Sequence, residues 1–95
     1  MDFEWDDEKN QANLIKHRIA FEEAALIFQG PVLTRIDNRK DYGEVREISI
    51  GQIEGQVVAV VVHTYRNGTI RIISARLANR TERERYHDHC KKIAQ

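Results

Sequence analysis

The stretch Ile70–Tyr86, IRIISARLANRTERERY, combines a strand, a turn and the start of a helix in seventeen residues. Five arginines fall within it, and two of them, Arg71 and Arg76, interrupt an apolar strand over residues 70–76. Because arginine is rarely fully buried without a partner, these two positions need an explanation. A basic strand that leads into a basic helix suits a phosphate-binding surface or an interface with an acidic protein.

Length and composition set the class of protein. The 95 residues predict one domain over residues 1–95, and 41% hydrophobic with 32% charged residues is typical of a soluble globular chain. The chain has no run of eighteen apolar residues, and its acidic N-terminus does not resemble a signal peptide. The single Cys90 excludes an internal disulfide and fits a reducing compartment. We therefore expect a cytoplasmic protein that does not associate with membranes.

The net charge of zero conceals an asymmetry along the chain. Residues 1–62 contain 7 Lys+Arg and 12 Asp+Glu, whereas residues 63–95 contain 8 Lys+Arg and 3 Asp+Glu. The two halves either neutralise one another in the fold or leave a basic side for a polyanion or an acidic partner.

Hydrophobic periodicity predicts a mixed α+β chain with two N-terminal helices, an antiparallel sheet and a C-terminal helix. Phe3 to Trp5 is expected to form a short strand with both aromatic rings on one face. A first helix follows from about Asp7 to Lys16, capped by Asp6 or Asp7. The remaining predicted elements are a helix over 21–29, a strand over 32–36, a mobile polar loop over 37–43, strands over 45–53, 56–66 and 69–76, and a helix from 81 to about 92. Thr81 and Glu84 are expected to form the capping box of the last helix.

Two turn signals predict the register of the sheet. Glu54-Gly55 and Asn67-Gly68 are typical of two-residue hairpin turns. The first turn would place Arg46 opposite His63, and the second would place Ala59 opposite Arg76. One face would then carry Arg46, His63, Tyr65, Ser74 and Arg76 over Ile48, Ile50, Val61, Ile70 and Ile72. The helices would cover the other face, which would carry Arg71, Glu47, Val58, Val60, Val62, Ile73 and Ala75.

Several side chains on this predicted working face could act on a phosphodiester. Arg46 beside His63 combines an anion-binding fork with a proton carrier, although Arg46 could instead pair with Glu44 or Glu47. Lys16 and His17 could reach the same surface or only cap the end of their helix.

The C-terminal segment holds two further candidates and one weak metal motif. Glu82 and Tyr86 share one face of the last helix, where a carboxylate could act as a base and a phenol could orient a phosphate. A helix-face hydrogen bond and a packed aromatic ring explain them equally well. Residues 87–90, HDHC, contain metal-ligand types, but neighbours at i and i+2 on a helix do not share a face. We expect no metal site and no cofactor.

The ordered set of motifs resembles the BrnT family of toxins from two-component toxin–antitoxin systems. The motifs are F-x-W-D at the start, NLIKHRIAFEEA over 13–24, Val45-Arg46, VVHTYR over 61–66, IRIISARLA over 70–78 and ERERY over 82–86. The resemblance covers about residues 3–86. Arg18 departs from the family, in which Gly often follows Lys-His, and Ala20 stands where a Ser or Thr cap is common.

The resemblance implies a RelE-like fold and metal-independent endoribonuclease activity on messenger RNA. It also implies a BrnA-type ribbon-helix-helix antitoxin as partner, with operator DNA bound only through the antitoxin and the complex repressing its own operon.

Attack of the 2′-hydroxyl on the phosphate would then be the reaction, and this requirement restricts the substrate to RNA. Arg46 and Arg76 are expected to hold phosphate, and His63, or His17 of the Lys16-His17 pair, to transfer the proton. Tyr86 would position the substrate, and Glu82 is a second candidate base. The expected RNA contacts are Arg66, Arg80 and Arg83.

A rival hypothesis is a non-catalytic module whose basic C-terminal half binds nucleic acid or an acidic protein. A purified chain that binds RNA but leaves it intact would favour this rival.

Overall fold

A computed structural model describes residues 1–94, and its centre is a five-stranded sheet in the order β1-β5-β4-β3-β2. Strands β2 to β5 pair antiparallel, as predicted, whereas the short β1 lies parallel to β5. The mixed α+β class is confirmed. The strands are β1 Phe3–Glu4, β2 Leu33–Asp37, β3 Arg46–Ile53, β4 Val57–Arg66 and β5 Thr69–Leu77.

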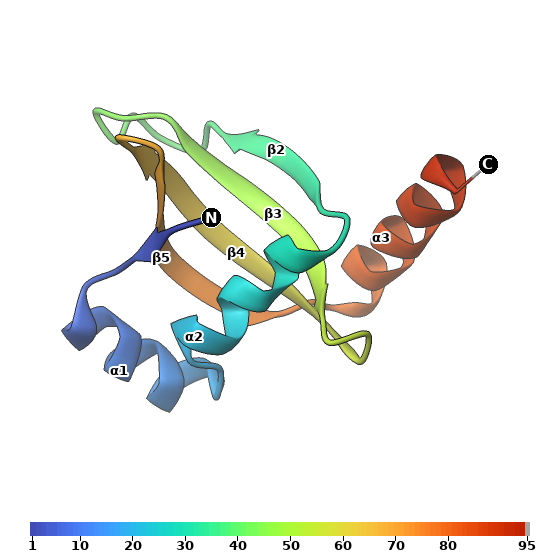
Figure 1. The fold of residues 1–95 in the computed structure, drawn as a ribbon, viewed down its shortest axis with the longest axis horizontal. Coiled ribbons are helices and arrows are strands. Elements are labelled where there is room, and N and C mark those ends of the chain that lie inside the picture. Colours follow the sequence, from blue (N-terminus) through green and yellow to red (C-terminus); the bar gives the residue numbers. More distant parts are fainter. Residues whose placement is uncertain (95) are drawn as a thin grey trace.

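The helices are α1 Asp7–His17, α2 Phe21–Ala24, the 3₁₀ helix η1 Ala25–Gln29, and α3 Arg80–Ile93. Figure 1 shows α1, α2 and η1 gathered on one side of the strands, with α3 set apart beyond the end of β3. No helix of residues 1–94 is long and apolar enough to cross a membrane.

Two groups of buried side chains define the two faces of the sheet. The covered face packs against α2 and η1 and carries Ala59, Val61, His63, Ile70, Ile72 and Ala75. The open face carries Ile48, Val60, Val62, Ser74 and Arg76 and is closed at one end by Tyr86 of α3. The sequence assigned the N-terminal helices to the face of Val58, Val60 and Val62, and this assignment is wrong.

The turn between β3 and β4 causes the first error in register. Ile53 pairs with Val57, and the Gln56 N–H donates to the Ile53 carbonyl at 3.0 Å, so the turn has three residues instead of two. Glu54 and Gly55 both adopt positive φ within it. The extra residue moves β4 by one position, so that His63 lies opposite Glu47 and not opposite Arg46. A shift of one residue places every side chain on the other face.

A bulge in β5 causes the second error. Near the Asn67-Gly68 turn the predicted register is confirmed, with Tyr65 opposite Ile70 and His63 opposite Ile72. The next pair is Val62 with Ser74, so Ile73 is the extra residue of the bulge. Farther along, Arg76 lies opposite Val60 and not Ala59.

The bulge also decides where the two arginines of β5 point. Arg71 lies opposite Thr64 and shares the open face with Arg76, although the sequence placed them on different faces. Arg71 pairs there with Glu4 of β1, Nη1 to Oε2 at 3.0 Å. Arg71 is thus an ion-pair residue at the β1 edge of the sheet.

The start of α3 differs from the predicted capping box. Asn79 is the N-cap: its Oδ1 accepts from the Glu82 N–H, and the Glu82 carboxylate accepts from the Asn79 N–H, both at 2.9 Å. The predicted pair Thr81 and Glu84 lies two residues too late. The earlier start brings Glu82 into the first turn, next to the end of β5.

The second predicted helix is α-helical only in α2 and continues as the 3₁₀ helix η1, which packs against β3. A Cβ added at Gly51 of β3 would lie 2.8 Å from Ile27 Cβ and 3.1 Å from Val32 Cγ1. Because glycine has no Cβ, Gly51 lets η1 approach the sheet this closely, which any other residue would prevent.

The end of α1 places Arg18 in the left-handed conformation. Asp6 caps the helix through its carboxylate, which accepts from the Lys9 N–H at 3.1 Å. Arg18 has φ 59° and ψ 30°, and its N–H donates to the Leu14 carbonyl at 2.8 Å. Glycine adopts this conformation without steric cost, which explains why Gly suits the position.

Candidate active site

A cavity of about 310 Å³ lies on the open face, between the end of α1 and strand β2. Its floor is apolar, with Ile48 from β3 and Val60 and Val62 from β4. Apart from Ala75, the rest of the lining is basic or polar: Lys16, His17, Arg35, Arg39, Ser74 and Arg76. No carboxylate is among these residues. Cations around an apolar floor suit a phosphate group.

Asn13 holds the end of α1 against the sheet. Its Nδ2 donates to the carbonyl oxygens of Ala75 at 2.8 Å and Ile19 at 3.0 Å, and its Oδ1 accepts from the Ala75 N–H at 3.1 Å. The buried amide thus pairs with the edge of β5 as a neighbouring strand would. This contact brings Lys16 and His17 to the cavity beside Arg76. The sequence analysis missed it, although an Asn within the apolar stripe of a helix is the signal.

Arg76 is held by Glu82 at the entrance to α3. Two parallel hydrogen bonds of 2.8 Å join the guanidinium to the carboxylate. The hydrogen bonds from Arg76 lower the pKa of Glu82 to about 2, even though partial burial opposes the shift. A carboxylate with this pKa and both oxygens occupied is a poor proton acceptor at neutral pH. Its geometry fits the positioning of Arg76 better than it fits the predicted role of a base.

Arg35 and Arg39 complete the cavity on the β2 side, and the sequence analysis missed both. Arg35 lies opposite Ile48 on the open face, and Arg39 follows β2 by two residues. The side chain of Asp37 is fully buried and binds Arg39 in a fork, Nε and Nη2 each at 2.8 Å. The Arg39 guanidinium lowers the pKa of Asp37 well below its usual range. The spacing Asp37-x-Arg39 in the predicted mobile loop was the sequence signal for this ion pair.

Arg46 lies outside the cavity, contrary to the predicted Arg46–His63 pair. Its guanidinium carbon lies 4.0 Å from the centre of the Tyr42 ring, and Nη2 lies 3.7 Å from Glu44 Oε1. The ion pair with Glu44 was the alternative that the sequence analysis left open. The longer turn between β3 and β4 separates Arg46 from His63 by placing them on opposite faces.

His63 is buried on the covered face and cannot contact a substrate on the open face. Its Nε2 lies 2.7 Å from Ser49 Oγ, which lies 2.8 Å from Thr34 Oγ1. The edge of the Phe28 ring packs against the imidazole, with ring centres 5.1 Å apart. Burial lowers the pKa of His63 to about 4, so the ring is neutral at pH 7. His63 is thus a buried sheet residue, as in the alternative interpretation, but only Nε2 is hydrogen-bonded and the buried Nδ1 has no partner among the described residues.

Tyr86 is also buried away from the cavity. Its hydroxyl donates to the Pro31 carbonyl at 2.8 Å, which fastens α3 to the segment before β2. Burial raises the pKa of Tyr86 to about 12. Tyr86 does not line the open-face cavity, so its hydroxyl does not contact a substrate bound there, contrary to the prediction.

None of the predicted RNA contacts lines the cavity. Arg66 Nη2 lies 3.6 Å from Glu44 Oε2, Arg80 pairs with Glu84 at 3.1 Å, and Arg83 donates to the Ala78 carbonyl at 2.9 Å. Of the seven predicted catalytic residues, the structure brings together Lys16, His17 and Arg76.

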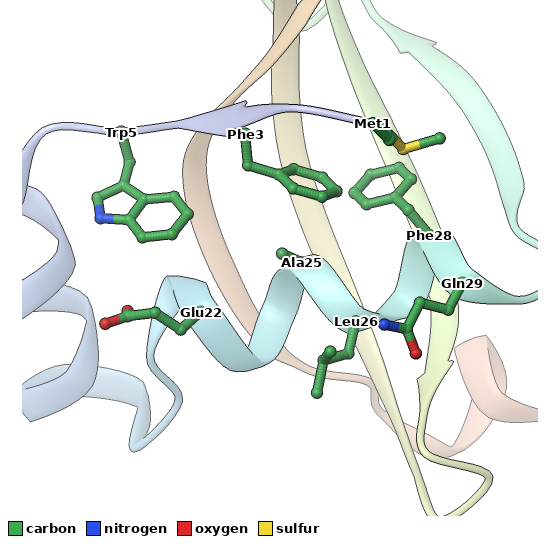
Figure 2. A pocket seen from close by; sticks show the side chains of 8 residues that line it. All are labelled: Met1, Phe3, Trp5, Glu22, Ala25, Leu26, Phe28 and Gln29. Carbon is green, nitrogen blue, oxygen red and sulfur yellow. The ribbon is translucent and has the colours of Figure 1, made fainter.

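A second cavity, of about 490 Å³, is apolar and lies between β1 and the helices α2 and η1. Figure 2 shows the rings of Phe3, Trp5 and Phe28 directed into it from both sides, with Glu22 at one end. Phe3 and Trp5 share a face, as predicted. Glu22 is the charged residue of the lining, and it accepts a hydrogen bond from Asn10 at 2.7 Å. This cavity lacks the cations that a phosphate requires.

No group of three or more His, Cys, Asp or Glu side chains within residues 1–94 is placed to hold a metal ion. On α3, His89 does not share a face with His87 or Cys90, and the i, i+3 pair His87 and Cys90 alone falls short of three ligands.

The fold and the cavity together define a small α+β protein with a basic cavity on one face of its sheet. The family model described as the ribonuclease toxin BrnT of type II toxin–antitoxin systems matches residues 5–82. The chain therefore belongs to the BrnT family of ribonuclease toxins. The matched range includes the cavity residues Lys16, His17 and Arg76, whereas Tyr86 lies beyond it.

A solved structure supports the fold. The crystal structure of the Brucella abortus ribonuclease toxin BrnT matches with a TM-score of 0.64 and 24% sequence identity. The match covers 84% of this chain and 99% of that chain. A comparison with curated protein sequences finds no match.

Proposed function

We propose that this chain is a metal-independent endoribonuclease that cleaves messenger RNA at the open-face cavity. The main observation behind this proposal is that Lys16, His17 and Arg76 line one cavity with an apolar floor. A lining of cations without carboxylates favours direct contact with phosphate oxygens over coordination of a divalent ion. The proposal extends the ribonuclease activity of the family to a defined site and reaction.

The proposed reaction is attack of the ribose 2′-oxygen on the adjacent phosphorus. His17 accepts the proton of the 2′-hydroxyl, the 2′-oxygen–phosphorus bond forms, and the bond from phosphorus to the 5′-oxygen breaks. The leaving 5′-oxygen takes a proton from the Lys16 ammonium or from water. The products are a 2′,3′-cyclic phosphate and a free 5′-hydroxyl.

Arg76 stabilises the extra negative charge of the pentacovalent phosphate. Its guanidinium keeps two of five N–H donors free after the two hydrogen bonds to Glu82 and a third, of 3.4 Å, to the Leu77 carbonyl. A fixed donor aimed at a developing charge contributes roughly 3–4 kcal/mol in a site that excludes water. Glu82 acts by holding this fork in one orientation.

The experiment is cleavage of a labelled RNA by purified protein in the presence of a chelator. We expect wild-type protein to produce fragments with 2′,3′-cyclic phosphate ends, and Lys16→Ala, His17→Ala and Arg76→Ala to lose most of the rate. The matched control is His87→Ala, which removes an exposed imidazole on α3 outside the cavity. Binding of RNA without any cleavage by the wild type would favour the rival non-catalytic module.

We further propose that the antitoxin of this system is a BrnA-type ribbon-helix-helix protein and that the toxin acts in the cytoplasm. In this proposal the domain belongs to the RelE-like superfamily, operator DNA is bound only through the antitoxin, and the complex represses its own operon. Membership in a type II toxin–antitoxin family supports an antitoxin partner. Co-purification with the product of an adjacent reading frame, followed by operator binding with and without it, tests these statements.

A further inference from the structure

The open-face cavity is wider than one phosphate group. It extends from β5 across β4 and β3 to β2. Adjacent strands lie about 4.8 Å apart, so the backbones of β5 and β2 are separated by roughly 14 Å. Lys16, His17 and Arg76 occupy the β5 side, and Arg35 and Arg39 occupy the β2 side. The proposed catalytic group therefore uses only part of the cavity.

Arg39 is fixed in place although its side chain is 64% exposed. Asp37, whose side chain is fully buried, accepts from Nε and Nη2 of Arg39 and also from its backbone N–H at 3.3 Å. The guanidinium retains three N–H donors for another acceptor. A side chain that is already ordered loses little conformational entropy when it binds a ligand.

The two sides of the cavity repeat one arrangement. Arg76 is held by Glu82 and Arg39 by Asp37, each through two hydrogen bonds of 2.8 Å. Both guanidinium groups line the same cavity, so their like charges repel one another. An anionic chain placed between them removes this repulsion.

We propose that Arg39, held by Asp37 and assisted by Arg35, forms a second phosphate-binding position on the β2 side of the cavity. It binds the phosphodiester of single-stranded RNA that neighbours the phosphate at Arg76. This proposal rests on the proposed function, because it names how the same site holds a polymeric substrate. Asp37 is the positioning residue, and Arg39 touches the substrate.

The substrate explains this arrangement better than an acidic segment of a protein partner does. Arg39 continues the line of cations that begins at Lys16, and they share one apolar floor. Neighbouring phosphates of a polynucleotide supply charges at regular spacing, and a guanidinium fork matches a phosphate in two hydrogen bonds.

The experiment measures binding of a short single-stranded RNA with 2′-O-methyl riboses, which cannot be cleaved, by fluorescence anisotropy at several salt concentrations. Arg39→Ala is expected to weaken binding roughly tenfold and to reduce the slope of log K against log salt by about 0.7. Arg39→Lys keeps the charge and the salt slope but loses the fork, so it should bind more weakly than wild type.

Asp37→Asn distinguishes positioning from simple charge. The substitution removes a negative charge, so an effect of net charge alone would tighten RNA binding. Loss of the fork that orients Arg39 would weaken RNA binding instead, and this is the expected result. Circular dichroism and urea unfolding establish that each variant is folded, and Arg39→Lys tests the same fork if Asp37→Asn does not fold.

The matched control is Lys40→Ala, one residue along the same segment. Lys40 does not line the cavity, and its ammonium lies 5.2 Å from the centre of the Tyr42 ring. It should leave the affinity and the salt slope unchanged. Equal binding by wild type, Arg39→Ala and Arg39→Lys would overturn the proposal, as would tighter binding by Asp37→Asn.

Two further outcomes separate this inference from the proposed function. Suppose that wild-type protein cleaves unmodified RNA and that Arg39→Ala cleaves and binds RNA as well as the wild type does. The proposal of a second phosphate-binding position would then be wrong, whereas the proposed active site would stand. An Arg39→Ala variant with weakened antitoxin binding and normal RNA binding would assign the position to the protein partner, which also overturns the proposal. Failure of wild-type protein to cleave RNA would remove the proposed function itself.

Discussion

His17 and His63 lie on opposite faces of the sheet, and their surroundings give the two imidazoles different chemistry. His63 on the covered face contacts Phe28 and Ser49, and its pKa falls to about 4 through burial. His17 on the open face lines a cavity together with Lys16 and Arg76. Both residues sit in motifs that indicate phosphate chemistry. Only their depth in the fold distinguishes the proposed proton carrier from the core residue.

The strongest test of this contrast is substitution of each histidine. We expect His17→Ala to lower the rate of RNA cleavage by roughly 10²–10⁴-fold, because it removes the proton acceptor, with little change in stability. His63→Gln should lower stability while its folded fraction cleaves at the wild-type rate. Urea unfolding measures the stability and the folded fraction of each variant, and single-turnover cleavage measures the rate of the folded protein. Loss of cleavage in folded His63→Gln together with normal cleavage in His17→Ala would place the active site on the covered face.

The second test uses pH. The folded protein holds His63 with a pKa of about 4 against an ordinary value of 6.5, so the unfolded chain binds the proton more readily. This group therefore stabilises the fold fully above pH 6.5, and the contribution is lost as pH falls from 6.5 towards 4. The expected loss is about 2–3 kcal/mol in the free energy of unfolding.

Urea unfolding at a series of pH values in this range measures that loss. His63→Gln should show a flatter dependence on pH than the wild-type protein. An unchanged slope in His63→Gln would show that other groups control acid stability.

The third test concerns the contact of Asn13 with Ala75, which holds α1 against the edge of β5. Asn13→Ala leaves the N–H and carbonyl of Ala75 without a partner, and each buried unpaired group costs roughly 1–3 kcal/mol. We expect a loss of about 2–3 kcal/mol in stability and slower cleavage, because Lys16 and His17 lose their support. Gln11→Ala on the exposed side of α1 is the control. Full cleavage activity in Asn13→Ala would show that the cavity does not need this contact.

The smallest expected effect is on the covered face alone. Gly51→Ala places a methyl group within 2.8 Å of Ile27 Cβ, so η1 must move away from β3. Overpacking of this kind costs about 1–2 kcal/mol. Thermal unfolding should report the loss, whereas folded protein should cleave RNA normally because the cavity lies on the other face. Gly30→Ala, with open space around the position, is the matched control.

Sequence reasoning succeeded where the signal is local. The helix over α1, its cap at Asp6 and the Asn67-Gly68 turn depend on residues within a few positions of one another. The family resemblance, carried by ordered motifs, is confirmed over residues 5–82. Lys16, His17 and Arg76 were among the predicted site residues and do meet in the cavity.

Sequence reasoning failed where one residue of register decided the outcome. The turn at Glu54 takes three residues, and Ile73 forms a bulge, although both strands read as regular. Each irregularity reverses the faces beyond it, which moved His63 out of the predicted site. Asp37 and Arg39 were assigned to a mobile loop because a polar segment does not reveal that one carboxylate is buried.

The amino-acid sequence by itself determined the α+β class, the order of the elements, the basic C-terminal half and the family. The fold class and the order of the elements follow from hydrophobic period and turn residues, the charge of the C-terminal half follows from composition, and the family was identified by the resemblance of its ordered motifs. All of these signals are local along the chain. Tertiary structure decided which face is open, which histidine lines the cavity, and which arginines share it. Those outcomes depend on strand pairing between distant residues, where an extra residue in a turn or a bulge moves side chains to the opposite face.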